Sequence, residues 1–327
     1  MGPSSPIIFL RDAETDPRFG KRPEDRSLEE RLKIGIINLD KPAGPTSHEV
    51  VAMVKRILNL PKAGHRGTLD PGVTGVLPIA LNKGTKVLDA LLLGTKTYVT
   101  NMRLHAPVDE EKLKAVLKEF TTLIYQTPPL KSSVKKVLRK RRIYNIELLE
   151  VEGQNVLFTV ESQSGTYIRT LCVDIGRVLG VGAHMAELRR IVSGPFSERK
   201  DLVTLQDLVE GVILLKDFKE ENYLKELILP IERAVDLAPK VWVTDGAVNA
   251  VCHGAPVAIP GIVKITENIQ KNSLVAIMTL KDELIGLGIA EMDSKEIQEK
   301  ENGIAVTVRS IIMERNIYPR TWKHDKN

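Results

Sequence analysis

The sequence predicts an α+β protein of two domains, a larger one that mixes helices with strands and a small β-barrel at the C-terminal end. A chain of 327 residues exceeds the usual single-domain size, and 43% of apolar residues suffices for sizeable cores. Two strand-like segments flank Glu152-Gly153 and predict a hairpin, Tyr144–Glu150 and Asn155–Glu161. Closely spaced short strands with turn residues between them predict the barrel, at Leu274–Leu280, Leu284–Ala290 and Ala305–Ile312.

The composition favours a nucleic-acid partner and gives no sign of a metal. The net charge is +5 and the pI about 9.0, a modest indication of polyanion binding. Cys172 and Cys252 stand among apolar residues and are expected to be core thiols, not a disulfide. The six histidines have no zinc-ligand spacing. No signal peptide or bilayer-length apolar run is evident, so a soluble cytoplasmic protein is expected.

The first elements are an arm, a strand and a capped helix. Residues 1–32 are rich in Pro, Arg, Asp and Glu and by composition predict a flexible arm. Gly35–Leu39 predicts a core strand that runs into a turn over residues 40–47. Thr46 and Glu49 have the spacing of a capping box, and the helix that follows carries valines at helical spacing.

A glycine-rich loop at residues 64–75 is the strongest candidate for a catalytic segment. Its sequence GHRGTLDPGVTG holds four glycines, one proline and one carboxylate, Asp70, so neither a helix nor an interior strand fits it. An ordinary surface turn would explain Asp-Pro-Gly alone. The apolar run that follows, residues 76–81, indicates instead a loop held between buried elements, where a carboxylate is well placed for chemistry.

The middle of the chain predicts further elements and a basic segment. Leu88–Gly94 predicts a short buried helix, Lys96–Leu104 an alternating strand, and residues 108–124 a helix. Within Lys131–Arg142, seven of twelve residues are basic and none is acidic. Positive charge at this density without compensating acids is typical of a polyanion-binding surface, although a solvated basic face remains an alternative.

Two segments follow with arginines near their ends. Gly165–Leu171 leads into a helix that Gly180 should close. Arg169 falls in its first turn, where the helix macrodipole disfavours a cation, so an acidic partner is expected. Val181–Ile191, with Leu188, Arg189 and Arg190, is also expected to be helical.

Five of these segments resemble motifs of the TruB family of pseudouridine synthases. They read DKPAGPTSHEVV, GHRGTLDPGVTGVL, QTPPLKSSV, GTYIRTL and AHMAELRRIVSGPF. The segment DGAVNAVCHGAPVAIPGI resembles a PUA domain. A full PUA module with the tail Tyr318-Pro319-Arg320-Thr321-Trp322 is similar to the catalytic subunits of box H/ACA ribonucleoproteins, the dyskerin group. The absence of a lysine-rich tail points to the archaeal branch.

The resemblance implies a fold and a domain division. The fold is a mixed, mainly antiparallel sheet flanked by helices, followed by the PUA barrel. The division is an N-terminal extension at 1–32 packed on the PUA domain, a catalytic domain at 33–236, and the PUA domain with its tail at 237–327.

The resemblance also implies roles for individual residues. Asp70 is the catalytic carboxylate, Arg169 its ion-pair partner, Tyr98 the ring that packs on the target base, and Leu188 an apolar wall of the base pocket. His65 prises or holds the RNA. The residues expected to contact RNA are Lys41, Arg189 and Arg190, and, on the family's thumb loop, Lys131, Lys135, Lys136, Arg139, Lys140, Arg141 and Arg142. Arg66 departs from the small residue common in the family at its position and adds an expected phosphate contact of its own.

The implied reaction converts uridine in RNA to pseudouridine without a metal or redox cofactor. The expected partners are a box H/ACA guide RNA, the substrate RNA, small Nop and Gar subunits and a kink-turn-binding ribosomal-type protein, with no membrane. A stand-alone enzyme acting on the tRNA T-loop shares the same motifs and stays open. A non-catalytic RNA scaffold would have no reason to keep Asp70, Tyr98 and Arg169 together. A two-carboxylate glycosidase would need a second acid such as Asp89 or Asp174 beside Asp70.

Overall fold

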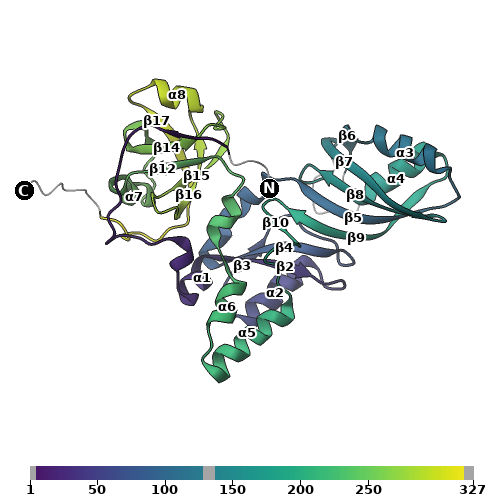
Figure 1. Ribbon diagram of the computed structural model, residues 1–327, viewed down its shortest axis with the longest axis horizontal. Helices are drawn as coiled ribbons and strands as arrows, with labels where there is room; N and C mark the ends of the chain where they lie inside the picture. The colour runs from purple at the N-terminus through teal and green to yellow at the C-terminus, as the bar shows by residue number, and fades with distance from the viewer. Residues whose placement is uncertain (1–4, 128–136, 320–327) are drawn as a thin grey trace, which may run out of the picture.

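Two curled β-sheets form the molecule in this computed structural model, which describes residues 5–127 and 137–319 (Figure 1). Within these residues the larger sheet has ten strands and the smaller has seven. The predicted α+β class with a C-terminal barrel-like unit is confirmed. No helix in the described ranges is long and apolar enough to cross a membrane. Cys172 and Cys252 are buried free thiols, as expected.

The larger sheet is mixed and mainly antiparallel. Its strands are β2 (Gly35–Lys41), β3 (Ala63–His65), β4 (Thr74–Leu81), β5 (Lys96–Leu104), β6 (Leu123–Gln126), β7 (Arg139–Glu152), β8 (Asn155–Ser162), β9 (Ala183–Ser193), β10 (Phe196–Ser197) and β11 (Leu229–Pro230). They run in the order β11-β2-β4-β9-β5-β8-β7-β6, with β3 paired to β4 and β10 paired to β9. Its one parallel pair among the described strands joins β4 to β9 and brings residues 74–75 beside Arg189 and Arg190.

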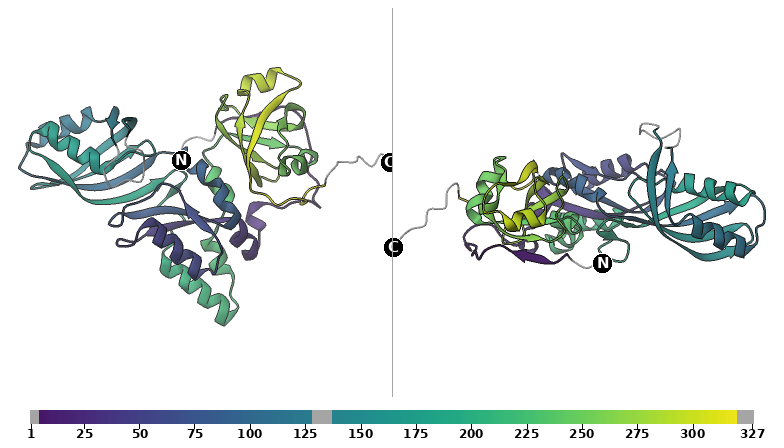
Figure 2. Two further views of the ribbon diagram at one scale, coloured as in Figure 1. Left: turned by 180° about the vertical axis from the view of Figure 1, so that it is seen from behind. Right: turned by 90° about the horizontal axis from the view of Figure 1, so that it is seen from above.

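Helices cover this sheet in two groups (Figures 1 and 2). At one end, α3 (Glu110–Glu119) and α4 (Ile168–Leu179) pack with β5 and β8 around a core that includes Met102, Phe158 and Leu171. At the other end, α2 (Ser47–Ile57), α5 (Leu205–Phe218) and α6 (Asn222–Leu227) pack against β2 and β4. The two ends of the sheet therefore have separate hydrophobic cores, and the pair of β4 and β9 lies between them.

The smaller sheet forms the C-terminal lobe. Its order is β1-β14-β12-β15-β16-β17-β13. The strands are β1 (Ile7–Phe9), β12 (Lys240–Val243), β13 (Val257–Ala258), β14 (Ile262–Thr266), β15 (Leu274–Met278), β16 (Leu284–Ala290) and β17 (Ile304–Ile311), and the helices are α7 (Asp245–Cys252) and α8 (Ser294–Glu299). The three strands predicted from the sequence correspond to β15, β16 and β17.

One apolar core joins the two lobes. It packs Val76 of β4 and Leu91 of the 3-10 helix η2 (Asn82–Leu92) against Trp242, Leu287 and Ile312 of the C-terminal lobe. The short 3-10 helix η3 (Ile231–Val235) contributes to the same core. Both lobes contribute buried apolar surface to this core. Separating the lobes would expose that surface to water, which favours a fixed orientation of one lobe against the other.

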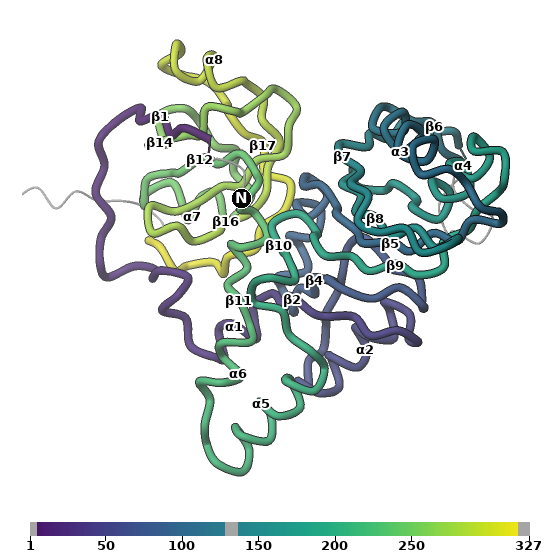
Figure 3. Tube along the Cα trace, turned by 45° about the vertical axis from the view of Figure 1, so that its right-hand side comes forward, coloured from purple at the N-terminus to yellow at the C-terminus, as the bar shows by residue number. Residues whose placement is uncertain are grey.

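The N-terminal segment wraps around the C-terminal lobe (Figure 3). β1 pairs antiparallel with β14, and the Arg11 guanidinium donates to the carbonyls of Ile259 and Pro260. The carboxylate of Asp245 accepts from the Thr15 hydroxyl and the Asp16 backbone N–H. The segment continues through the 3-10 helix η1 (Pro23–Asp25) into α1 (Leu28–Ile34). The flexible arm expected from composition alone is thus wrong for the described part of this segment, since tertiary hydrogen bonds order it.

Several local predictions are confirmed. The strand at Lys96–Leu104 matches β5, the Thr46–Glu49 capping box opens α2, and Gly180 ends α4 in the left-handed conformation at φ +80°. Each of these features depends on residues close together in the sequence, so the sequence pattern was sufficient to predict it.

Three local predictions are wrong. The helix expected over 108–124 covers only α3, because residues 123–126 pair with β7 as β6. The short buried helix expected over 88–94 is instead the end of the longer 3-10 helix η2, which stops at Leu92, and Leu92 and Leu93 are exposed. The segment 181–191, expected to be helical, is mostly strand β9, which pairs with β5 along nearly its whole length. Pairing between distant strands overrides local propensity in such cases.

Candidate active site

The loop that carries Asp70 joins β3 to β4, at the place where β4 meets β9. Gly75 begins the return into β4 with φ +105°, and a side chain there would collide with the Arg190 backbone. Only glycine allows this approach, because the left-handed backbone and the close contact both exclude a Cβ. The glycine-rich composition of the loop thus serves close packing of β4 against β9.

The turn before α2 holds the loop on both sides of Asp70. Lys41 is fully buried, and its ammonium donates to the carbonyls of Pro42, Pro71 and Val73 at 2.8–3.0 Å. Burial lowers the pKa of Lys41, and the nearby charge of Asp70 opposes that shift. The Ser47 hydroxyl exchanges two hydrogen bonds of 2.9 Å with the backbone of Leu69. The expected RNA contact of Lys41 is therefore wrong, because its donors are used inside the protein.

Arg190 holds the two ends of the same loop. Its side chain is 1% exposed, and it donates to the carbonyls of Gly67 and Val76 at 2.8 Å each. Arg190 is thus a buried brace, and the expected phosphate contact is wrong for this residue.

Arg189, the residue before Arg190, forms ion pairs with two carboxylates inside the protein. It binds both oxygens of Asp40 at 3.0 Å and Glu198 at 2.8 Å. Two carboxylates around one guanidinium leave little net attraction for phosphate, so the structure does not favour the phosphate contact expected of Arg189.

The carboxylate of Asp70 and the guanidinium of Arg169 are in direct contact, as the sequence predicts. Arg169 is the second residue of α4, and the start of that helix is fixed by Gln126. The Gln126 side chain is buried and exchanges two 3.0 Å hydrogen bonds with the Tyr167 backbone. Asp70 supplies the negative charge that offsets a cation at a helix N-terminus.

The pair is more open to water than a dry cleft would be. The side chains of Asp70 and Arg169 are 55% and 47% exposed. The loop lies between buried elements, as expected, but the ion pair itself lies at an open surface of the protein, where a ligand can reach it.

Tyr98 and Leu188 lie on one face of neighbouring strands beside the loop. Tyr98 of β5 is opposite Arg190, and Thr100 of β5 is opposite Leu188. Residues opposite one another in antiparallel strands, and those two apart, share a face of the sheet. Tyr98 is 8% exposed and packs in one core cluster with Leu69 and Val73 of the loop, and the half-buried Leu188 packs against that cluster. The structure therefore brings Asp70, Arg169, Tyr98 and Leu188 together.

His65 lies at the end of β3 with its ring edge-to-face with His48, at 5.0 Å between centroids. Neither ring nitrogen has a hydrogen-bond partner among the described residues. Burial, with the charges of His48 and Arg190, lowers the pKa of His65 to about 4. His65 is therefore a neutral ring at physiological pH.

This burial predicts an acid-sensitive stability. The unfolded chain takes up a proton at His65 near pH 6.5, whereas the folded chain does so only near pH 4. We expect the free energy of unfolding to fall as the pH is lowered from 6.5 to 4, and His65→Gln to flatten that slope. Urea unfolding at each pH measures it. The matched control is His184→Gln, at an exposed histidine. If the free energy of unfolding of His65→Gln depends on pH as steeply as that of the parent, the prediction is contradicted.

The basic residues of β7 lie next to the start of α4. Arg141 donates to the carbonyl of Gly165 at 3.1 Å, and the Lys140 ammonium is 5.5 Å from the centroid of the Tyr125 ring. Arg139 and Arg142 belong to the same strand. Lys131, Lys135 and Lys136 lie outside the described residues. The described part of the basic run thus leads to the loop before Arg169.

The two acids weighed as second carboxylates for glycosidase chemistry have other roles. Asp89 pairs with Arg66 at 3.4 Å and with Arg309 of β17 at 2.7 Å, and Asp174 pairs with Arg177. Arg66 is thereby tied to the seam between the lobes. Neither acid is an unpaired second carboxylate for Asp70.

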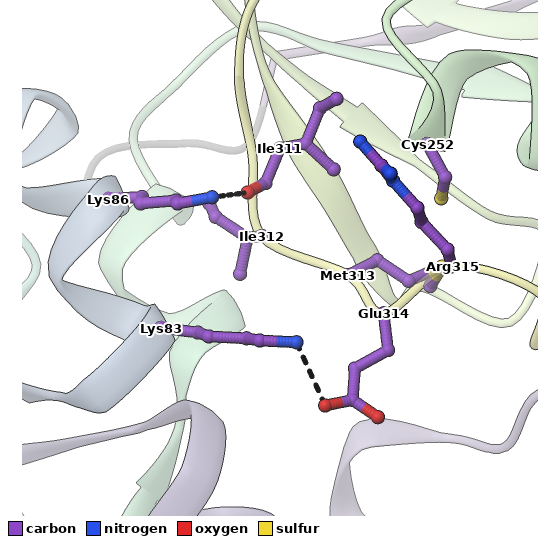
Figure 4. A pocket seen from close by; sticks show the side chains of 8 residues that line it. All are labelled: Lys83, Lys86, Cys252, Ile311, Ile312, Met313, Glu314 and Arg315. Atoms are coloured by element: carbon purple, nitrogen blue, oxygen red, sulfur yellow. Dashed lines mark hydrogen bonds and ion pairs between the residues drawn. The ribbon is translucent and has the colours of Figure 1, made fainter.

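A cavity of about 530 Å³ lies at this seam, away from the catalytic loop (Figure 4). Lys83 pairs with Glu314 at 2.9 Å, and Lys86 donates to the Ile311 carbonyl at 2.8 Å. Arg315 and Cys252 complete its wall on the C-terminal side. Its lining includes none of the residues around Asp70, so the candidate active site is the open surface at the loop and not this cavity.

Sequence analysis missed Ser47 and Gln126 as supports of the site. Both stand in motifs that the sequence offered, Ser47 in PTS at the start of α2 and Gln126 in QTPP at the end of β6. Their role comes from backbone groups 22 and 41 positions away, which residue type and spacing do not indicate.

Family models match nearly the whole chain. They are the DKCLD (NUC011) domain at residues 4–51, the TruB family pseudouridylate synthase N-terminal domain at 55–168, the tRNA pseudouridylate synthase B C-terminal domain at 169–236, and the PUA domain at 239–312.

Several relatives and solved structures match along nearly their full length. "Probable tRNA pseudouridine synthase B" of Thermococcus kodakarensis is 56% identical over 97% of this chain and 94% of the relative, and that of Methanopyrus kandleri is 52% identical over 97% and 93%. The structure of an H/ACA RNP bound to a substrate RNA containing 2'-deoxyuridine matches with a TM-score of 0.93, 52% identity and coverage of 98% of both chains. A Cbf5-Nop10-Gar1 complex matches with a TM-score of 0.94, 54% identity and coverage of 97% of both chains.

Proposed function

The chain belongs to the TruB family of pseudouridine synthases, and from that premise we propose that it isomerises uridine to pseudouridine in RNA as the catalytic subunit of a box H/ACA ribonucleoprotein. The contact between Asp70 and Arg169, beside Tyr98, is the observation that carries the chemistry. The full-length match to the protein of an H/ACA particle carries the assignment to a guided enzyme.

The reaction breaks the N1–C1′ bond of uridine and forms a C5–C1′ bond, with no atom or electron gained. The carboxylate of Asp70 has two candidate tasks, attack at C1′ and removal of the 2′ proton, and both need it ionised. Arg169 keeps a permanent positive charge against it, since a guanidinium does not deprotonate in proteins. The pair is therefore oriented before substrate arrives.

Target recognition needs the uridine to leave its stack, at a cost of a few kcal/mol. Stacking on an aromatic ring returns about 1–3 kcal/mol per base. Tyr98 is the aromatic residue beside Asp70 that we assign to this task, with Leu188 on the same face as an apolar wall. A base placed there also covers the ion pair, which water reaches in the RNA-free chain.

We divide the chain into the extension 1–32, the catalytic domain 33–236 and the PUA domain with its tail 237–327. The matched PUA model and the pairing of β1 with β14 support this division. The partners are a guide RNA, the substrate RNA, a Nop10-like and a Gar1-like subunit, as in the matched complexes. We add a kink-turn-binding ribosomal-type protein and assign the particle to the cytoplasm, both on the sequence expectations alone.

A stand-alone action on tRNA is the second candidate, because the relatives carry the name tRNA pseudouridine synthase B. The test assays the purified chain on a tRNA transcript, and the chain assembled with accessory proteins on a guide and target RNA. Pseudouridine only in the guided reaction supports our proposal, and efficient modification of tRNA alone supports the second candidate. A chain inactive in both reactions would overturn the enzymatic assignment.

The basic strand β7 predicts a salt effect. Replacing Lys140 and Arg142 with glutamine should weaken RNA binding and reduce the slope of log K against log[salt] by about 1.5, since each phosphate contact contributes about 0.7–0.9. Filter binding at several salt concentrations measures the slope. Lys216→Gln in α5 together with Lys219→Gln, at the residue that follows α5, removes the same charge elsewhere and should leave the slope unchanged. Equal slopes in both double variants would exclude the phosphate contacts.

A further inference from the structure

We propose that Ser47 is a positioning residue for Asp70, acting through the backbone of Leu69. The activity part of this inference rests on the proposed function. The Ser47 side chain is fully buried, and its hydroxyl accepts from the Leu69 N–H and donates to the Leu69 carbonyl, each at 2.9 Å. One side-chain oxygen therefore satisfies both polar groups of the residue directly before Asp70.

The hydroxyl is free for this task because the capping of α2 is done by its neighbours. Thr46 is the N-cap, and its side chain accepts from the Glu49 N–H while the Glu49 carboxylate accepts from the Thr46 N–H. Ser47 follows as the first helical residue. Val50 and Val54 fix α2 in the core against β2 and β4. Ser47 thus projects from a rigid element onto the loop.

Residues on both sides of Asp70 are held in this way. Before it, Leu69 is fixed by Ser47, and its side chain is 4% exposed in the cluster that contains Tyr98. After it, the Pro71 carbonyl accepts from the Lys41 ammonium at 3.0 Å and from the Gly44 N–H at 2.9 Å. The backbone is therefore anchored at positions 69 and 71, and Asp70 projects from between them to Arg169.

The bond to Leu69 needs a group that donates and accepts at once. Alanine at position 47 would leave the Leu69 N–H and carbonyl without that partner, and the loop could shift to find water. A shift of about 1 Å in a reacting group can lower a rate by about 100-fold without changing how substrate is held elsewhere. Ser47 should therefore govern turnover and leave RNA affinity unchanged.

The experiment compares Ser47→Ala with Ser162→Ala in the full chain assembled with guide and target RNA. Ser162 is also fully buried, but its hydroxyl has no hydrogen-bond partner among the described residues, so its loss removes the same atom without releasing a backbone group. The measurements are the single-turnover rate, the Kd for RNA, the Tm, and amide hydrogen exchange of residues 66–75 by mass spectrometry.

We expect Ser47→Ala to react about 100-fold more slowly with its Kd within about twofold, and its loop to exchange faster. Ser162→Ala should match the parent in the single-turnover rate, the Kd for RNA and the hydrogen exchange of residues 66–75. Equal rates and equal loop exchange in the two variants would overturn the proposal. So would a rate loss in Ser47→Ala that follows a lower Tm and weaker RNA binding. If the parent itself makes no pseudouridine, the proposed function fails, and the exchange at residues 66–75 still decides whether Ser47 holds the loop.

Discussion

Asp70→Asn is expected to lower the rate of pseudouridine formation by at least about 1000-fold, because losses of this size or larger accompany removal of the reacting group in other enzymes. The amide has the shape of the carboxylate but neither its charge nor its basicity, so attack at C1′ and proton removal at the 2′ position both fail. The backbone of the loop is held by Lys41, Ser47 and Arg190, whose hydrogen bonds go to backbone groups and not to the Asp70 side chain. RNA affinity should therefore stay within about twofold of the parent.

Mass-spectrometric detection of pseudouridine and filter binding measure the two quantities. Asp174→Asn is the matched control, since Asp174 is an acid on α4 that pairs with Arg177 and not with the loop. It should retain parental activity. Loss of RNA binding together with activity in Asp70→Asn would contradict the separation of chemistry from binding.

Arg169→Met is expected to lower kcat by about 100-fold or more, with a small change in KM. Methionine keeps an unbranched, though shorter, side chain and removes the donors that orient the Asp70 carboxylate. Arg169→Lys should recover part of the loss, because an ammonium supplies the charge without the planar fork of donors. A cation at a helix N-terminus is unfavourable by itself, so the Tm of Arg169→Met should not fall.

Steady-state kinetics with guide and target RNA, and thermal unfolding, test this prediction. Arg177→Met removes an exposed arginine from the last turn of the same helix, and its kcat should be unchanged. A parental kcat in Arg169→Met would refute the role of the ion pair. A Tm drop that accounts for the lost rate would reduce Arg169 to a structural residue.

The sequence alone determined the family and predicted the contact between Asp70 and Arg169. GTLDP and GTYIRTL identified Asp70 and Arg169 as partners across 99 positions, and the two are in contact. The sequence also determined elements such as β5 and the N-cap of α2, because strand alternation and a capping box depend only on residues a few positions apart.

Only the tertiary structure decided which basic residues can meet RNA. Lys41 and Arg190 look in the sequence like the arginines and lysines of β7, yet they are buried and bind loop carbonyls. Residue type gives the charge of a side chain, whereas its burial depends on contacts with segments 30–32 positions away for Lys41 and 114–123 positions away for Arg190. The same reason explains β9, expected to be helical, and the open position of Asp70. The residue type sets the chemistry of a side chain, but packing in the tertiary structure decides whether a ligand can reach that side chain.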